Sequence, residues 1–209
     1  MLKKIIVGIC ILAVVWHFWG PLPKAEWKGV PASPDPVQVG GDLPVSWMKG
    51  IYTITPRARY HIKAVVLSKH YYWAGYDEDV LAPYDLALGW GVMSEARVIN
   101  ALKFVHGGRW YNFMWKGDPP EPLDEMVRHA SNHHILAADE NVLRQIKKLR
   151  RFDLVDLEGY LVDVTKKDGW HWNSSLTRDD SGGGACELFW VKSVNPAIAP
   201  PVGNWLASV

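Results

Sequence analysis

An uninterrupted apolar run near the N-terminus constrains this chain more than any other feature. Residues 5–19 (IIVGICILAVVWHFW) contain no Lys, Arg, Asp or Glu and directly follow Lys3 and Lys4. A basic pair before an apolar segment is typical of an export signal or a signal anchor. Extended through Leu22, with aromatic side chains at the interface, the run is long enough to span a bilayer.

The residues after this run favour an anchor that stays attached. Residues 18–21 (FWGP) stand where a signal peptidase requires small side chains, so we expect an uncleaved transmembrane helix over residues 1–20. The positive-inside rule then keeps the N-terminus cytoplasmic. We therefore expect a single-pass membrane protein that contacts the bilayer through residues 5–22 and has an extracytoplasmic body. The alternative is a buried N-terminal helix of a cytosolic domain.

Three further segments follow the anchor. Residues 21–44 carry six of the 14 prolines and predict an extended linker. We expect one globular domain over residues 45–195 and an irregular Pro-rich tail over residues 196–209. A hydrophobic content of 48% excludes a disordered chain. The net charge of +1 gives no cationic surface for phosphates, so nucleic acid is not an expected partner.

The body has the pattern of a β-rich domain. Residues 59–66 alternate between polar and apolar side chains, residues 152–165 predict a long strand with a bulge or sharp bend at Gly159, and Asp168-Gly169 predicts a hairpin turn. A further strand is expected over residues 187–194. These features predict a β-rich α+β fold, specifically a small, curved, OB-like β-barrel with helical insertions. A split α+β sandwich is the alternative.

Helical periodicity is confined to short segments of the body. We expect a helix from Ser94 to about residue 106, ended by Gly107-Gly108, then an aromatic strand over residues 109–115. A short helix over residues 123–130 and a helix capped by Asp139 follow. The apolar, Gly-interrupted residues 83–93 indicate only a turn-rich, partly buried segment.

Histidines gather after the short helix, at His129, His133 and His134. A spacing of four would place His129 and His133 on one face of a helix, as a divalent metal requires. A third ligand would have to come from a distant residue such as His61, His106 or Asp85. Two ligands do not make a site. We therefore interpret these histidines as structural and expect no metal and no cofactor.

Cys186 follows a glycine-rich loop and is a candidate nucleophile. A thiolate needs a base, and His133 or His134 could supply one if the fold brings it close. This is the basis of an alternative function, an envelope hydrolase or transferase. The simpler interpretation is a small buried residue at the start of a strand. The other cysteine, Cys10, lies within the apolar run.

Tryptophan is far more abundant than in an average domain, with 12 in the chain, of which Trp16 and Trp19 belong to the anchor. Trp170 and Trp172 would share one face of a strand, and Arg109 beside Trp110 adds a guanidinium. Such a surface can stack on sugar rings or on a partner's aromatic residues. These four residues are the candidate binding residues, and core packing is the alternative for each tryptophan.

Several segments of the body resemble a family of uncharacterised proteobacterial membrane-anchored proteins. They are KAVVLSKHYYW, APYDLALGWGVMS, RWY, SNHHILAADE, GYLVDV and WHWNSSLTRDDSGGGACELFWV, within residues 50–194. The resemblance implies a distinct domain behind an N-terminal apolar segment and implies no activity. Together with the predicted anchor, it implies a single-pass protein of a bacterial inner membrane with a periplasmic body. The sequence alone therefore predicts a membrane-anchored, extracytoplasmic binding or accessory domain of the bacterial envelope, whose partner is an envelope protein or a glycan.

Overall fold

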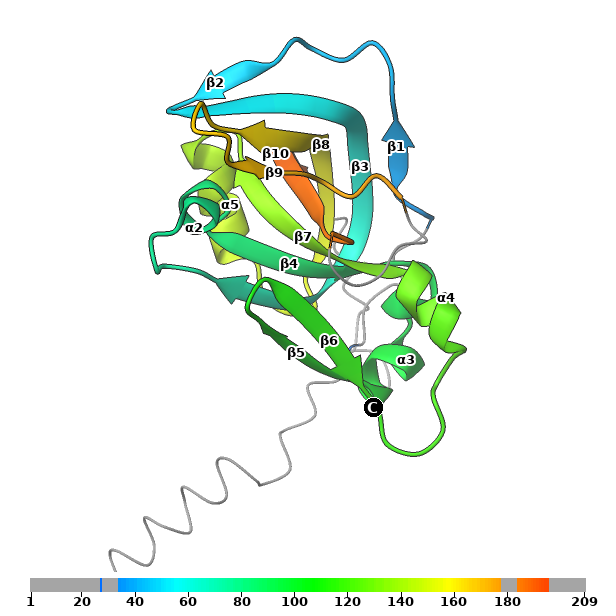
Figure 1. Cartoon of the computed structure of the whole chain (residues 1–209). Helices are drawn as coiled ribbons and strands as arrows, with labels where there is room; N and C mark the ends of the chain where they lie inside the picture. The colour runs from blue at the N-terminus through cyan, green and yellow to red at the C-terminus, as the bar shows by residue number, and fades with distance from the viewer. Residues whose placement is uncertain (1–26, 28–33, 178–183, 196–209) are drawn as a thin grey trace, which may run out of the picture.

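The computed structural model describes residue 27, residues 34–177 and residues 184–195 (Figure 1). The predicted anchor and the predicted tail lie outside these residues. Among the helices of the described ranges, none combines the length and apolarity that crossing a bilayer requires.

The body is β-rich with a few short helices, as the sequence predicts. Its strands are β1 (Val37–Val39), β2 (Trp47–Lys49), β3 (Tyr52–Tyr71), β4 (Tyr84–Gly89), β5 (Lys103–Gly107), β6 (Trp110–Met114), β7 (Ala130–Ala137), β8 (Leu154–Thr165), β9 (His171–Trp172) and β10 (Glu187–Asn195). Its helices are α2 (Asp77–Leu81), the 3-10 helix η1 (Gly91–Ser94), α3 (Ala96–Ala101), α4 (Leu123–Arg128) and α5 (Glu140–Lys148).

Five strands pair into a barrel-like ring. The order is β3, β4, β7, β10, β8 and back to β3, and the β7 and β10 pair is parallel (Figure 1). The ring is not evenly closed, because different parts of β3 pair with its two neighbours. Residues 53–65 of β3 pair with β8, and residues 65–71 pair with β4. Strands β1, β2 and β9 attach to the ring, while β5 and β6 form a separate hairpin.

The length of β3 is compatible with a ring because its pairing register shifts at two points. Its register with β8 shifts between Pro56 and Ala58, and its register with β4 shifts between Val66 and Ser68. An extra residue at each point bends a strand and increases its twist. One strand can therefore begin in the β8 pairing and end in the β4 pairing.

The core inside the ring comes from alternate residues of all five strands. It includes Tyr60 and Ile62 of β3, Leu86 of β4 and Phe189 of β10. Helix α5 adds Val142 and Ile146 to this cluster. Asp139 caps α5 as predicted, since its Oδ1 accepts hydrogen bonds from the backbone N–H groups of Asn141 and Val142.

Two clusters cover the outside of the ring. One contains Val65, Ala87, Met93, Val98 and Ile99, against which the β5–β6 hairpin packs. The other contains Ile54, Leu136, Leu188 and Trp190, with the rings of Trp170 and Trp172 against it. The residues of β4 are therefore buried on both faces.

Two local predictions need correction. The helix expected to run to residue 106 ends at Ala101, and residues 103–107 form β5 instead. The buried stripe does include Val98 and Ile99, but Val105 is 46% exposed and pairs across the hairpin with Asn112, so strand pairing decides its conformation. The segment 83–93, expected to be turn-rich, contains the fully buried strand β4.

Part of the predicted linker packs on the body. Trp27 is 7% exposed, and its Nε1 donates to the backbone oxygen of Ser94 at 2.7 Å. Its backbone N donates to Oδ1 of Asn100. Further along, β1 pairs with β3. The described part of the range 21–44 therefore includes contacts that fasten the chain to the ring.

Candidate functional site

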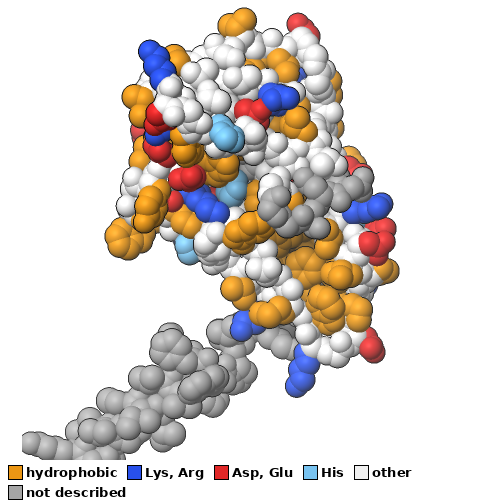
Figure 2. All heavy atoms as spheres, in the orientation of Figure 1, with side chains coloured by type: hydrophobic (Ala, Val, Ile, Leu, Met, Phe, Trp, Pro, Cys, Tyr) orange, Lys and Arg blue, Asp and Glu red, His pale blue; other side chains and the backbone are white. Residues whose placement is uncertain are grey.

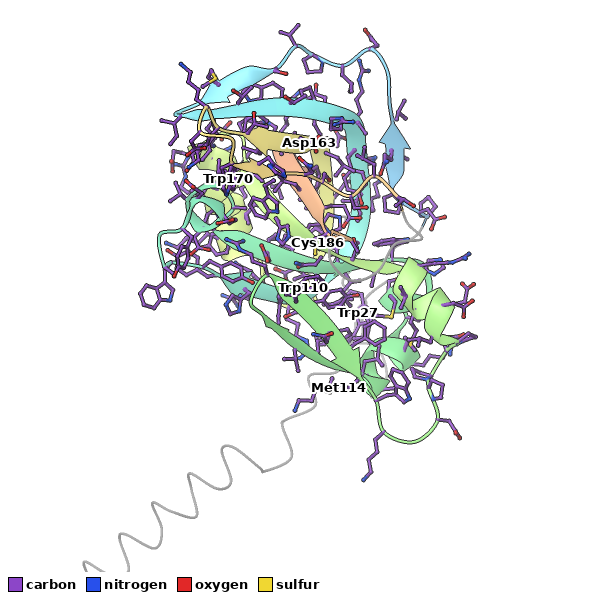
Figure 3. The ribbon with its side chains drawn as sticks, viewed as in Figure 1. Trp27, Trp110, Met114, Asp163, Trp170 and Cys186 are labelled. Atoms are coloured by element: carbon purple, nitrogen blue, oxygen red, sulfur yellow. The ribbon has the colours of Figure 1, made fainter. Side chains whose placement is uncertain are left out.

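A cavity of about 470 Å³ lies between the ring and the β5–β6 hairpin. Strand β6, helix α4, the start of β7 and residues 185–187 surround it. Figure 3 labels Cys186, which directly precedes β10, and Trp110, the first residue of β6; both line the cavity. The residues that line it are Trp90, Trp110, Tyr111, Asn112, Phe113, Trp115, Leu123, Val127, Arg128, Ala130, Ser131, Asn132, Thr177, Ala185, Cys186 and Glu187.

Aromatic side chains from β6 and its flanks form the apolar wall. Tyr111 and Phe113 are the half-buried positions of β6, and their rings are 6.2 Å apart. Trp115 continues this series, 6.3 Å from Phe113. Trp110 is 44% exposed, so the wall continues to the molecular surface. In Figure 2, hydrophobic side chains gather on the lower part of the body, where β6, α3 and α4 lie in Figure 1. Leu123, the first residue of α4, lines the cavity and is 53% exposed.

Polar groups occupy the side of the cavity that faces β7 and β10. The Nδ2 of Asn132 lies 3.7 Å from Sγ of Cys186, and the same amide donates to the backbone oxygen of Arg109 at 3.1 Å. Sγ of Cys186 is 3.9 Å from that backbone oxygen. Arg128 adds a cation to the lining. The cavity therefore combines an aromatic wall with hydrogen-bonding groups and a thiol.

The hairpin that carries the aromatic wall is held by Arg109. Gly108 and Arg109 form its two-residue turn with φ of 61° and 68°, the left-handed values of a type I′ turn. A non-glycine residue with positive φ is energetically costly, and here the side chain compensates. Its Nη2 lies 2.6 Å from Oδ1 of Asp79, and its Nη1 lies 2.8 Å from Oδ1 of Asp85. The guanidinium also stacks on Tyr72, at 3.7 Å from the ring centre.

Asp85 is the centre of this polar cluster and has no exposed surface. Burial alone would raise the pKa of its carboxyl. The hydrogen bond from Nδ1 of His134 at 2.9 Å and the charges of His134 and Arg109 outweigh burial, so the pKa of Asp85 is below its ordinary value. The carboxylate is therefore ionised and holds both the hairpin and β7.

His106 of β5 lies at the edge of the same cluster. Its side chain is 3% exposed, and its Nε2 is 4.0 Å from Oδ2 of Asp85. Burial lowers the pKa of His106 to about 4, and the nearby Asp85 charge offsets only part of this effect. Neither ring nitrogen makes a hydrogen bond of good geometry with a described residue, although the adjacent Asn132 amide favours the protonated form. A neutral, buried imidazole therefore stands behind the cavity wall.

The two histidines proposed as bases for Cys186 lie on opposite faces of β7. His134 faces outward and bonds Asp85. His133 faces into the ring, where its Nε2 is 3.1 Å from the hydroxyl of Tyr60 and 4.0 Å from Oε2 of Glu187. On β7, Asn132 approaches the thiol, with its Nδ2 at 3.7 Å from Sγ of Cys186.

The helix face that would have paired His129 with His133 does not exist. Helix α4 ends at Arg128, and His133 lies in β7. His129 Nδ1 bonds the backbone oxygen of Glu125, and its ring lies beside Trp90. The spacing of four therefore has no helical meaning here, because β7 alternates its faces with a period of two.

The candidate binding residues separate into two groups. Trp110 lines the cavity. Trp172 lies against the Arg109 guanidinium at 5.5 Å and against His134 at 4.7 Å, so it packs around the polar cluster. Trp170 is 6.5 Å from Trp172 and packs on Tyr52 (Figure 3). Arg109 contributes its backbone oxygen to the polar side of the cavity and its guanidinium to the cluster behind it.

Sequence reasoning considered Asp85 only as a distant metal ligand, and it did not select Asn132 or Tyr111 as binding residues. A charged residue inside the apolar run of residues 83–93 was the available signal for Asp85, because an isolated acid within a buried strand needs a partner. Asn132 and Tyr111 carry no such signal. Their role depends on where the hairpin folds back onto β7.

Comparison of the chain with protein-family models, curated proteins and solved structures found no match.

Proposed function

We propose that this chain is a membrane-anchored, extracytoplasmic binding domain of the bacterial envelope that binds a glycan in the aromatic cavity. The observation that carries the proposal is the cavity itself. Its volume of about 470 Å³ lies in the usual range for small-ligand sites, and its lining joins aromatic rings to a few polar groups.

The order of strands supports an OB-like barrel as the scaffold of this site. Numbered along the chain, the five ring strands are arranged 1-2-3-5-4-1, with α5 between the third and fourth. OB-folds bind oligosaccharides and oligonucleotides on strands 2 and 3 and on the loops between strands 1 and 2 and between strands 4 and 5. In this chain strand 3 is β7, which lines the cavity, and residues 185–186 belong to the connection between strands 4 and 5.

The chemistry of the lining favours a sugar over a nucleic acid. A pyranose ring presents C–H groups that stack on indole and phenol rings, and hydroxyls that bond amides and guanidinium groups. Trp110 and Tyr111 supply the first kind of contact, and Asn132 and Arg128 the second. Arg128 is the only Lys or Arg among the described lining residues, whereas a phosphate backbone requires several cations.

The test is calorimetric titration of the full chain, in detergent micelles, with chitooligosaccharides and with soluble peptidoglycan glycan fragments. We expect saturable binding of one of the two. Trp110→Ala is expected to weaken it by about 10-fold, because it removes a stacking partner worth about 1.4 kcal/mol.

Trp73→Ala is the matched control. Trp73 is 80% exposed and is not part of the cavity lining, so its loss should leave the affinity unchanged. Absence of binding of both saccharides at millimolar concentration, or equal effects of the two substitutions, would refute the proposal. Capture of an envelope protein that depends on Trp110 without any glycan binding would instead favour a protein partner.

The second candidate is an envelope hydrolase or transferase that uses Cys186. Its support is the position of the thiol on the cavity lining, where a bound substrate would meet it. Nucleophilic catalysis requires a base within hydrogen-bond reach of the thiol. The histidines that could act as the base are His134, which bonds Asp85, and His133, which bonds Tyr60. The aromatic rings and polar groups of the lining favour a binding role for the cavity.

A further inference from the structure

A second group of side chains lies on the ring away from the cavity, where β3 pairs with β8. It consists of His61 on β3 and of Asp156 and Glu158 on β8. His61 pairs directly with Glu158 in the antiparallel register, and Asp156 lies two residues before Glu158 in β8. One ligand atom from each residue lies within 4.8 Å of the others. We propose that these three side chains bind a divalent transition-metal ion of the Zn²⁺ class.

The distances between the ligand atoms suit such an ion. Nε2 of His61 lies 2.8 Å from Oδ1 of Asp156 and 4.0 Å from Oε1 of Glu158. Ligand atoms on a tetrahedral zinc ion, each about 2.0–2.1 Å from the metal, are separated by about 3.3 Å. The two distances bracket that value, so a small rotation of the exposed Glu158 side chain completes the set.

The donor types also suit zinc. One imidazole nitrogen and two carboxylate oxygens are ligands that Zn²⁺ accepts, whereas Ca²⁺ and Mg²⁺ prefer oxygen ligands alone. A groove of about 550 Å³ borders the group and is lined by His61 and Glu158. Solvent in this groove can supply a fourth ligand. No described residue lines both this groove and the aromatic cavity, so the metal site is independent of the proposed glycan site.

The neighbouring groups define what the metal must compete with. Nζ of Lys63 lies 3.2 Å from Oδ2 of Asp156. Nδ2 of Asn195 donates to Oδ1 of Asp156 at 3.1 Å and to Oε1 of Glu158 at 3.4 Å. Lys63 is half exposed and can turn toward solvent. The groove's other cations have partners of their own, since Arg59 bonds Asp42 and Lys192 lies over the ring of Tyr160. A metal ion would therefore displace the Asn195 amide from both carboxylates and would compete with the Lys63 ammonium for Asp156.

The sequence contains no local signal for this site. His61 and Asp156 are 95 positions apart, and the pairing of β3 with β8 alone brings them together. A metal here would join the two strands on which the ring closes. Because an ion that binds only the folded state adds to its stability, zinc is also expected to raise the melting temperature.

The test is calorimetric titration of the full chain, prepared without a histidine tag, with ZnCl₂. We expect one ion per chain. Asp156→Asn and Glu158→Gln should each weaken the affinity by at least about 10-fold, since even second-shell changes cost 10–100-fold. Lys63→Met should strengthen binding, because it removes the competing ammonium. His171→Ala, at an exposed histidine elsewhere, is the control and should change nothing.

Co²⁺ provides a readout that does not depend on stability. A nitrogen and carboxylate oxygens around tetrahedral Co²⁺ give a visible absorption band, which His61→Gln should abolish. The alternative outcome is a group that forms ion pairs only. In that case zinc shows no saturable 1:1 binding, or binds the Asp156 and Glu158 variants as tightly as the parent chain, and Lys63→Met has no effect. Either result overturns the proposal.

Discussion

Nη1 of Arg109 lies 2.8 Å from Oδ1 of Asp85, which joins the turn of the β5–β6 hairpin to a fully buried residue near the start of β4. The aromatic wall of the cavity belongs to the hairpin, and its polar side belongs to the ring. One ion pair therefore sets the distance between the two halves of the site. The left-handed backbone of Arg109 and the stacking of its guanidinium on Tyr72 orient the guanidinium toward Asp85.

Arg109→Ala should destabilise the chain by about 3 kcal/mol, because it leaves the buried Asp85 carboxylate with only part of its compensation. Arg109→Lys keeps the charge without the planar guanidinium, so its free energy of unfolding should lie between those of the parent chain and the Ala variant. Urea unfolding followed by tryptophan fluorescence measures the difference.

Arg59→Ala is the comparison for this change. Arg59 pairs with Asp42 at 2.9 Å, but both side chains are more than half exposed, so the loss should be below about 1 kcal/mol. Equal losses for the two arginines would mean that the Arg109 pair contributes no more than a surface pair.

The sequence predicts the elements of the ring much better than it predicts the site. Alternation in β3, the Asp139 cap and the Asp168-Gly169 turn are local signals, and the structure confirms each. The helix expected to reach residue 106 was wrong beyond Ala101, because the pairing of β5 with β6 outweighs a continuing apolar spacing. Strand pairing is a long-range effect that periodicity does not contain.

The site depends on such long-range pairings. Cys186 and Trp110 were selected from the sequence as candidate site residues because of their side-chain chemistry, and both line the cavity. The distance between Cys186 and Trp110 depends on the hairpin turn at Gly108-Arg109. From the sequence, Gly107-Gly108 was expected only to end a helix. The tryptophans of the Trp-x-Trp segment carry the same composition signal as Trp110 but pack on the other outer cluster.

His106 should make the stability of the chain fall between about pH 6.5 and pH 4. Its folded-state pKa of about 4 lies below the ordinary value of 6.5, so in this window the unfolded chain binds a proton that the folded chain does not. Stability attributable to the neutral buried ring is present above pH 6.5 and is lost as the pH falls, by on the order of 3 kcal/mol.

His106→Phe tests this because phenylalanine cannot titrate and brings no polar atoms into the site. The variant should be at least as stable as the parent at pH 7, and its urea midpoint should fall less on going to pH 5. Parallel pH profiles for the two proteins would assign the acid sensitivity to other groups.

Gly159→Ala should destabilise the ring by more than about 2 kcal/mol. A Cβ at this position would lie 1.9 Å from the backbone oxygen of Trp190 and 3.1 Å from the backbone N of Lys192. Neither neighbour is a flexible side chain that can move aside. The pairing of β8 with β10 would therefore have to open at its bulge, between Val191 and Ser193.

Gly40→Ala is the matched substitution, since a Cβ there meets nothing within 4 Å. Its free energy of unfolding should change by no more than about 0.5 kcal/mol. A similar small change at Gly159 would show that the two strands tolerate a wider separation than the structure has.

The thiol of Cys186 should report on whether the cavity is occupied. It is half buried and lines the cavity, so a small maleimide should label it in the folded protein and a bulky one more slowly. Cys10 is the other cysteine of the sequence, and a Cys10→Ala background confines labelling to Cys186. A saturating saccharide should slow the reaction, because a ligand between Trp110 and Asn132 covers Sγ.

A cysteine at the exposed position 73, introduced as Trp73→Cys with Cys186→Ala, should label at the same rate with and without saccharide. If calorimetry detects binding while the Cys186 rate stays constant, the saccharide occupies a different surface. If Cys186 is labelled by neither reagent, the thiol is closed to solutes and the alternative of a cysteine enzyme is excluded.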